Sequence, residues 1–415
     1  MSEVQVVCRV GYALNPKKLR MAKHADNLND KETLYSQTET KDTLNPQGEE
    51  RGVGSEKLAA PWCGGGLATI VGLNTLASEA EVDGVVFYPL NLHSEFHVIL
   101  HKLTEDLDAD IEDSSGANGI GSSRKLRDVE SYLQQHPDVA IVDPLESVRN
   151  VINREKTCLC LRRVQERLRE RCPFMQPDFA VINEQDLFTL SGSRSAAITT
   201  AMISHNMTFP VICKPVKACG TAESHKMTIV FSNEGFSALT GPFLMQRFHD
   251  HGAVFYKVYV LEREVLITPR RSLPNLERAM HDLLSAGMHC LSFDSRVDFP
   301  SLPDCCTDTT EQGNSCSMQD NGDAASIDAA LHAQLVLAAS EISLEFGLSL
   351  YGFDVIVPLD RPADILVVDV NYFPSYKNVP DFPAKLRAHL RHAARLPAWQ
   401  QPTAMAPTST AVPGL

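Results

Sequence analysis

The segment Ile365-Leu-Val-Val-Asp369-Val-Asn371 is an apolar run that ends with two oxygen-bearing side chains two residues apart. An earlier apolar run, Phe353-Asp354-Val-Ile-Val357, carries a further carboxylate. Side chains at positions i and i+2 of a strand share a face, and pairing of the two runs as a hairpin would bring Asp354 to the face of Asp369 and Asn371. Magnesium prefers such hard oxygen ligands and usually arrives with a nucleotide's phosphates. The segment therefore predicts a magnesium site at the end of paired strands.

Composition places the chain among ordinary soluble globular proteins. Its 415 residues, 43% hydrophobic and 22% charged, leave room for two or three domains. A formal net charge of -14 argues against broad nucleic-acid binding, which leaves a basic footprint. No apolar stretch approaches the roughly 20 residues of a membrane helix, and the N-terminus lacks a secretory pattern. We expect a cytoplasmic monomer, with a nuclear location left open and with neither membrane nor nucleic acid as a partner.

The first 150 residues alternate strand and helix patterns, which predicts an open α/β domain with a mainly parallel sheet. Strands are expected at residues 4–10, 84–89, 96–100 and 139–142, and a helix at 125–136. Polar segments at about 24–66 and 108–123 hold few large apolar residues, so they are interpreted as disordered inserted loops.

Strand and helix patterns continue through the rest of the chain. Helices are expected at 150–171 and 327–346, and strands at 178–183, 209–214, 226–231 and 243–248. A third insert is expected at 301–323 and a disordered tail at 397–415, because both are rich in small and polar residues.

One strand pair has the pattern of a phosphate-binding flap. Phe209-Pro-Val-Ile-Cys-Lys214 ends in a lysine, and a glycine-containing loop leads into the return strand at 226–231. Such a flap can lay backbone N–H groups over phosphates, with Lys214 as a point charge. The alternative, a surface hairpin with a snorkelling lysine, remains open. The sequences GxxxxGK[ST] and GxGxxG are absent, which disfavours P-loop and Rossmann sites.

The following segment can complete a nucleotide site. Gln246 ends one strand and Lys257 lies in the next, so the connection can offer backbone groups to an adenine edge and a lysine to a phosphate. His249 and His251 lack a nearby third metal ligand, and we expect both to be solvent-exposed loop residues.

Basic residues recur at expected strand ends, where open α/β sheets place ligands. Their number suggests an anionic substrate with several phosphates, although nine ordinary surface charges remain an alternative. With the predicted magnesium site, they favour magnesium-dependent phosphoryl transfer. They are Lys17, Lys18, Lys102, Arg154, Lys214, Lys217, Lys257, Arg270 and Arg271.

An ordered set of short motifs resembles the inositol trisphosphate 5/6-kinase and inositol-tetrakisphosphate 1-kinase family, more its plant branch than its animal one. The resemblance covers roughly three-quarters of the chain and implies an ATP-grasp fold with mixed sheets. It implies an N-terminal α/β domain at 1–150 that binds the inositol phosphate, a central subdomain at 151–240 and a C-terminal subdomain at 241–396 with the magnesium site. The motifs are Val10-Gly-Tyr-Ala-Leu-Asn-Pro-Lys17-Lys18, His101-Lys-Leu-Thr104, Asp143-Pro144, Asn153-Arg154, Ile212-Cys-Lys214, Gly220-Thr221, Ser224-His225, Gln246, Tyr256-Lys257-Val258, Arg270-Arg271-Ser272-Leu273-Pro274, Gly352-Phe353-Asp354 and Asp369-Val-Asn371-Tyr-Phe-Pro374.

The resemblance also implies roles for individual residues. Contacts to the inositol phosphate are implied for Lys18, Lys102, His225, Lys257, Asn371 and Ser375. Contacts to ATP are implied for Arg154, Lys214, Gln246, Arg247, Phe248, Lys257 and Ser272. Asp354, Asp369 and Asn371 match the magnesium ligands, and Lys214, His225 and Asp369 are the expected catalytic residues. His225 is the candidate general base, although the reaction does not strictly require one.

The implied activity is transfer of the ATP γ-phosphoryl group to the 5- or 6-hydroxyl of inositol trisphosphate, or to the 1-hydroxyl of inositol tetrakisphosphate. Two departures bear on the substrate: Ser375 replaces the family's glycine, which permits close backbone approach, and the first insert interrupts the helix after Lys18. The alternatives are an ATP-grasp carboxylate–amine ligase, which has less need of so many cations, and a catalytically silent inositol-phosphate sensor, which has no need of magnesium.

Overall fold

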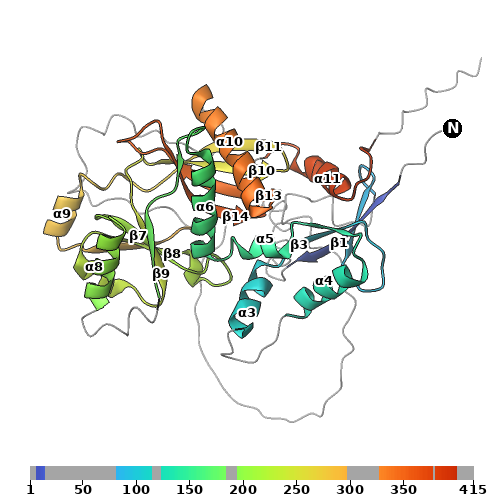
Figure 1. The fold of residues 1–415 in the computed structure, drawn as a ribbon, viewed down its shortest axis with the longest axis horizontal. Helices are drawn as coiled ribbons and strands as arrows, with labels where there is room; N and C mark the ends of the chain where they lie inside the picture. Colours follow the sequence, from blue (N-terminus) through green and yellow to red (C-terminus); the bar gives the residue numbers. More distant parts are fainter. Residues whose placement is uncertain are drawn as a thin grey trace, which may run out of the picture.

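Three β-sheets and the helices around them make up the part of the chain that the computed structural model describes (Figure 1), namely residues 6–14, 81–114, 123–183, 194–296, 327–376 and 379–399. The predicted inserts at 24–66 and 301–323 lie outside these residues. No helix within the described ranges has both the length and the apolar character needed to cross a membrane.

The N-terminal sheet is open and parallel, as the alternation of strands and helices predicts. Its strand order is β2-β1-β3-β4, and every pairing in it is parallel. Its strands are β1 (Cys8–Leu14), β2 (Val85–Pro89), β3 (Val98–Lys102) and β4 (Ala140–Val142). Its helices are α3 (Thr104–Ser114), α4 (Arg124–Gln135) and α5 (Leu145–Arg149).

Two predictions in this region were wrong in position. The first strand continues through Gly11 instead of turning there, because the glycine lets β3 pack closely: a Cβ would lie 2.8 Å from Ile99 Cδ1 and 2.9 Å from Phe96 Cδ2. The polar segment expected from residue 108 begins within α3. Leu103 and Leu107, one helical turn apart, are fully buried, and acidic residues in the first turn suit a helix N-terminus.

The C-terminal sheet has the strand order β11-β10-β13-β14-β5 and is antiparallel except for the β14–β5 pairing. Its strands are β5 (Phe174–Met175), β10 (Val254–Leu261), β11 (Glu264–Arg271), β13 (Leu350–Ile356) and β14 (Ile365–Tyr372). Around it lie α6 (Arg154–Leu168), α10 (Ala329–Phe346) and α11 (Phe382–Ala393). α11 packs against both this sheet and the N-terminal sheet, and one apolar core runs through the two.

The third sheet has the order β12-β8-β7-β9-β6 and is antiparallel. Its strands are β6 (Phe179–Ile182), β7 (Val211–Pro215), β8 (Lys226–Val230), β9 (Phe243–Arg247) and β12 (Cys290–Asp294), so it extends past residue 240 in the sequence. Helices α8 (Arg194–Ser204) and α9 (Met280–Ser285) flank it (Figure 1), with the 3₁₀ turns η1 (Glu223–His225) and η2 (Asn233–Ala238).

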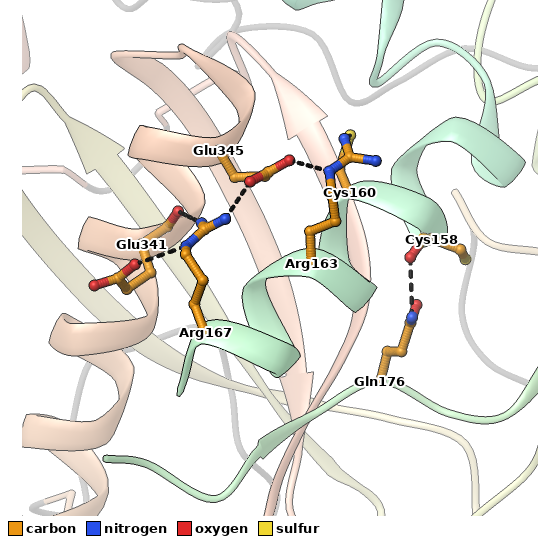
Figure 2. A network of polar contacts seen from close by, with 7 residues as sticks. All are labelled: Cys158, Cys160, Arg163, Arg167, Gln176, Glu341 and Glu345. Carbon is orange, nitrogen blue, oxygen red and sulfur yellow. Dashed lines mark hydrogen bonds and ion pairs between the residues drawn. The ribbon is translucent and has the colours of Figure 1, made fainter. Parts of the chain in front are cut away.

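Helices α6 and α10 are joined by ion pairs along their length. Arg163 Nε lies 2.5 Å from Glu345, and Arg167 pairs with Glu345 and, at 3.3 Å, with Glu341 (Figure 2). On the other side of α6, Gln176 Nε2 donates to the Cys158 carbonyl at 2.9 Å. Because α6 also packs against β5 and β14, this network fixes the helix whose N-terminus lies beside the pocket described below.

The start of the predicted disordered tail is packed against the N-terminal sheet. Arg391 donates to the carbonyl of Pro397, and its guanidinium carbon lies 5.2 Å from the centre of the Trp399 ring. That ring covers Gly84, where a Cβ would come within 2.0 Å of Trp399 Cε3. The tail from residue 400 onward lies outside the described residues.

Candidate active site

A pocket of about 670 Å³ lies where the third sheet faces the C-terminal sheet. Strands of both sheets contribute side chains, and Lys102 reaches it from the end of β3. The pocket therefore lies where segments from all three sheets meet.

Two carboxylates and an amide lie together on one wall. Asp354 on β13 is directly opposite Asp369 on β14, and Gly352 is opposite Asn371. Asn371 Nδ2 donates to Asp369 Oδ2 at 2.9 Å. The hairpin pairing expected from the sequence is confirmed, and the three predicted magnesium ligands share a face that lines the pocket.

Lys257 approaches Asp354 from the other side. It is opposite Asp354 in the β10–β13 register, and its Nζ lies 2.7 Å from Asp354 Oδ1. Burial raises the pKa of the Asp354 carboxyl, against the opposing effect of the lysine. Burial lowers the pKa of the Lys257 ammonium, but the Asp354 carboxylate outweighs burial and leaves that pKa above its ordinary value. Lys257 therefore pairs with Asp354, the first of the two carboxylates.

Lys214 is held in the pocket by an irregularity in β14. The register shifts after Asp354, so that Val368 is an extra residue without a partner on β13. Its carbonyl accepts a hydrogen bond from Lys214 Nζ at 3.0 Å. Lys214 is only 6% exposed; burial lowers the pKa of its ammonium, and Asp369 partly offsets this effect. The bulge thus fixes Lys214 beside the wall that carries Asp354, Asp369 and Asn371, which we call the carboxylate wall.

Lys102 connects the N-terminal sheet to the end of β14. Its Nζ donates to the carbonyl of Tyr372 at 3.2 Å and to that of Phe373. Both acceptors immediately follow Asn371. The contact therefore places Lys102, a predicted inositol-phosphate contact, beside the end of the strand that carries the predicted metal ligands Asp369 and Asn371.

His225 lies on the wall formed by the third sheet, at the end of η1. Burial lowers the pKa of its imidazole, and the nearby guanidinium groups of Arg296 and Arg154 lower it further. The lowered pKa favours the neutral form of the imidazole at pH 7. Phe293, Ser295 and Arg296, at the end of β12 and just beyond it, also line this wall and were not predicted as site residues. The alternation in Cys290-Leu-Ser-Phe293 was the available signal for that strand.

The side predicted to hold the nucleotide contains Gln246, Arg247, Phe248 and Ser272, all of which line the pocket. Gln246 is 3% exposed, and its Oε1 has no hydrogen-bond partner among the described residues. A buried acceptor of this kind commonly awaits a donor from a ligand or water.

The expectation that His249 and His251 are solvent-exposed was wrong. They are 5% and 7% exposed, because the turn that carries them folds under the segment around Ser272. His251 Nε2 and Ser272 Oγ share a hydrogen bond at 2.6 Å, and His251 Nδ1 donates to the His249 carbonyl at 2.7 Å. The histidines thus support the wall that Ser272 presents to the pocket.

Two of the predicted site residues that the structure describes, Arg154 and Ser375, do not line the pocket. Arg154 is buried behind it, and its guanidinium donates to the carbonyls of Pro215 and Lys217 at 2.7 Å each and of Ser224 at 3.1 Å. Ser375 follows a proline that does line the pocket. Its φ lies outside the left-handed region, so this position does not require glycine for its backbone conformation. Lys18 lies outside the described residues.

The carboxylate wall suits magnesium better than a transition metal. The described residues contain no group of three or more His, Cys, Asp and Glu side chains that could hold a metal ion. Two carboxylates and an amide oxygen are a partial shell of hard ligands, and magnesium characteristically keeps waters and substrate phosphates in its remaining positions. Because Asp354 and Asp369 are directly opposite each other on the face that lines the pocket, their oxygens can bind one cation together, so the residues present fit magnesium.

Residues 185–392, half of the chain, match the family model described as "Inositol 1,3,4-trisphosphate 5/6-kinase ATP-grasp domain". An inositol-tetrakisphosphate 1-kinase of Danio rerio is 30% identical over 307 residues, which cover 73% of this chain and 68% of that protein. Inositol-tetrakisphosphate 1-kinase 6 of Oryza sativa subsp. indica is 29% identical over 311 residues, which cover 72% of this chain. The chain spans about half the length of that rice relative, at 52%.

Among solved structures, the ADP complex of purK, N5-carboxyaminoimidazole ribonucleotide synthetase, aligns with a TM-score of 0.45 and 9% identity. The alignment covers 96% of this chain and 80% of that one.

Proposed function

This chain belongs to the inositol 1,3,4-trisphosphate 5/6-kinase family of ATP-grasp proteins, and from that premise we propose that it transfers the γ-phosphoryl group of ATP to a hydroxyl of an inositol polyphosphate. The observation that carries the proposal is the cross-strand pair Asp354 and Asp369, set in a pocket with Lys102, Lys214 and Lys257. Two opposed carboxylates suit a divalent cation, and the lysines suit phosphates on both substrates. The proposed acceptor is the 5- or 6-hydroxyl of inositol trisphosphate, or the 1-hydroxyl of inositol tetrakisphosphate.

Positioning and charge neutralisation supply most of the catalysis in phosphoryl transfer, because the transition state is loose. In the proposal, Asp354, Asp369 and Asn371 hold magnesium, with the amide contributing Oδ1 because its nitrogen already donates to Asp369. Bound there, magnesium would offset the charge on the phosphates of ATP.

The chain's own cations orient the two substrates. We assign Lys214, fixed by the Val368 carbonyl, to the phosphates of ATP, together with Arg247, Phe248 and the buried Oε1 of Gln246 on the nucleotide side. Ser272, whose hydroxyl is hydrogen-bonded to His251, completes the nucleotide contacts. Lys257, paired with Asp354, lies between the two substrates and contacts both.

The acceptor side is assigned to Lys102, His225 and Asn371. His225 can accept the proton of the attacking hydroxyl, because its lowered pKa favours the neutral form of the imidazole at pH 7. Lys18 and Ser375 remain predicted contacts to the inositol phosphate. For Arg154 we propose that it acts on ATP through the loop after β7, whose carbonyls it holds.

We also infer a cytoplasmic monomer with inositol polyphosphates and ATP as its partners, and with a nuclear location left open. The formal net charge of -14 supports the inference that neither nucleic acid nor an anionic membrane surface is a partner.

One assay tests the proposal against its alternatives. The protein is incubated with ATP, magnesium and a panel of inositol phosphates, and the products are separated, with Asp369→Asn as the inactive control. A new inositol phosphate and stoichiometric ADP are expected. Binding of inositol phosphate without any product would indicate a sensor. ADP and phosphate released only when a carboxylic acid and an amine are supplied would indicate a ligase.

A further inference from the structure

A buried set of polar groups joins the N-terminal sheet to the two strands that carry the carboxylates. We call it the joint; it consists of His101, Asp143, Ser349 and Tyr372. His101, Asp143 and Tyr372 are 0%, 3% and 4% exposed, so their contacts exclude water. Of the four residues of the joint, Tyr372 lines the pocket and the other three do not.

Tyr372 connects β14 to β3. Its hydroxyl donates to the His101 carbonyl at 2.8 Å, and its ring lies 5.4 Å from the His101 ring. In return, the next residue on β3, Lys102, donates to the Tyr372 carbonyl at 3.2 Å. A side chain of β14 thus donates to a backbone carbonyl of β3, and a side chain of β3 donates to a backbone carbonyl of β14.

Asp143 connects β13 to the same sheet. Its carboxylate accepts from Ser349 N at 2.8 Å, from Ser349 Oγ at 2.6 Å and from Leu350 N at 2.9 Å, at the start of the strand that carries Asp354. The Asp143 carbonyl accepts from His101 Nε2 at 2.6 Å. Both carboxylate-bearing strands are thus fixed to the end of β3.

The alternation of side chains along a strand couples the joint to the pocket. On β14, Asn371 faces the pocket and Tyr372 faces the joint; on β3, Lys102 reaches the pocket and His101 faces the joint. A shift of Tyr372 relative to His101 would therefore move Lys102 relative to Asn371 and Asp369.

We propose that Tyr372 is a positioning residue that fixes the distance between Lys102 and the carboxylate wall, and thereby selects which inositol hydroxyl meets the γ-phosphate. The inference rests on the proposed function. In the proposal, Lys102 binds a phosphate of the inositol substrate, and the magnesium site at Asp369 positions the γ-phosphate of ATP. Only the hydroxyl that lies at the matching distance from the phosphate on Lys102 is then aligned for attack on the γ-phosphate. Tyr372 acts through its hydroxyl, which donates to the His101 carbonyl.

The test compares Tyr372→Phe with Tyr351→Phe. Tyr351 is directly opposite Tyr372 on β13 and is equally buried, but its hydroxyl donates to the Ala339 carbonyl of α10 at 2.6 Å, away from the joint. Both variants lose one buried hydroxyl, so comparable shifts in Tm are expected. The measurements are kcat and KM for inositol 1,3,4-trisphosphate, its binding without ATP, and the ratio of 5- to 6-phosphorylated product.

Tyr372→Phe is expected to raise KM and the dissociation constant about tenfold and to shift the product ratio, because a misplacement below 1 Å has effects of this order. Tyr351→Phe should leave the ratio unchanged. Ser349→Ala, which loosens the joint from β13, should shift the ratio in the same direction, and it carries the test if Tyr372→Phe does not fold. An unchanged ratio in the folded joint variants, with normal wild-type turnover, would overturn the inference alone. Wild-type protein that forms no inositol phosphate product would overturn the proposed function and the inference with it.

Discussion

Asp354 and Asp369 face each other directly across β13 and β14, with Lys257 only 2.7 Å from the first of them. Like charges opposite one another destabilise a sheet, so this pair is unfavourable for folding. Residues that are unfavourable for local stability are concentrated at functional sites. Mutation of this pair should therefore affect activity far more than stability.

Replacing Asp369 with asparagine keeps the shape of the side chain and removes one of the two charges. We expect turnover to fall by about 10³-fold or more, because the predicted metal ligand is lost. The free energy of unfolding should change by less than about 1 kcal/mol, because the repulsion from Asp354 that disappears is offset by the lost attraction to Lys214. Steady-state kinetics and urea unfolding check both. Asp360→Asn, at an exposed position, is the control and should change neither; full activity of Asp369→Asn in magnesium buffer would refute the metal assignment.

Lys257→Met should destabilise the protein by about 2 kcal/mol, because it leaves the Asp354 carboxylate buried without its cation. The double variant Lys257→Met/Asp354→Asn should recover most of that loss, since no unpaired charge remains. Urea unfolding of the wild type, Lys257→Met, Asp354→Asn and the double variant gives the coupling energy. Additive losses would show that the 2.7 Å contact contributes nothing to stability.

Arg154→Met should loosen the loop after β7, because three backbone carbonyls lose a charged donor. We expect a loss of about 2–3 kcal/mol in the free energy of unfolding and faster amide exchange at residues 216–224. Arg162→Met is the matched control on the same helix: its guanidinium lies over the Phe179 ring at 4.8 Å, a contact of about 0.5 kcal/mol at an exposed site. If amide exchange at residues 216–224 stayed slow in Arg154→Met, the hydrogen bonds from Arg154 would not be what orders this loop.

The carboxylate wall could be predicted from the sequence because its geometry is local. The period of a strand fixes the common face of Asp369 and Asn371, and the short connection between the apolar runs favours the hairpin that adds Asp354. The open parallel sheet followed in the same way from alternating strand and helix patterns. The resemblance supplied the family, because many weak motifs occurred together in order.

Contacts between distant segments could not be predicted. Lys214 and Val368 are 154 residues apart, and the bulge that turns the Val368 carbonyl leaves no mark in the apolar run around it. The burial of His251 likewise depends on Ser272, which contacts it from the segment just after β11. Local polarity indicated a surface turn, and tertiary packing overrode it.

The joint makes a prediction about acid stability through His101. Burial lowers the pKa of this fully enclosed imidazole to about 4, although its hydrogen bond to the Asp143 carbonyl acts in the opposite direction. An unfolded histidine titrates near 6.5, so between pH 6.5 and 4 the unfolded chain binds more protons than the folded one. Stability from this residue is therefore complete above pH 6.5 and is lost as the pH falls through that window.

His101→Gln keeps a donor for the Asp143 carbonyl but cannot take up a proton in this range. On lowering the pH from 7 to 5, wild-type protein should lose about 2 kcal/mol more unfolding free energy than the variant does. Urea unfolding at the two pH values measures this difference, with each protein at pH 7 as its own reference, so that any direct cost of the substitution cancels. Equal losses in the two proteins would mean that His101 does not titrate between the folded and unfolded states, and that acid weakens the link between β3 and β4 through another group.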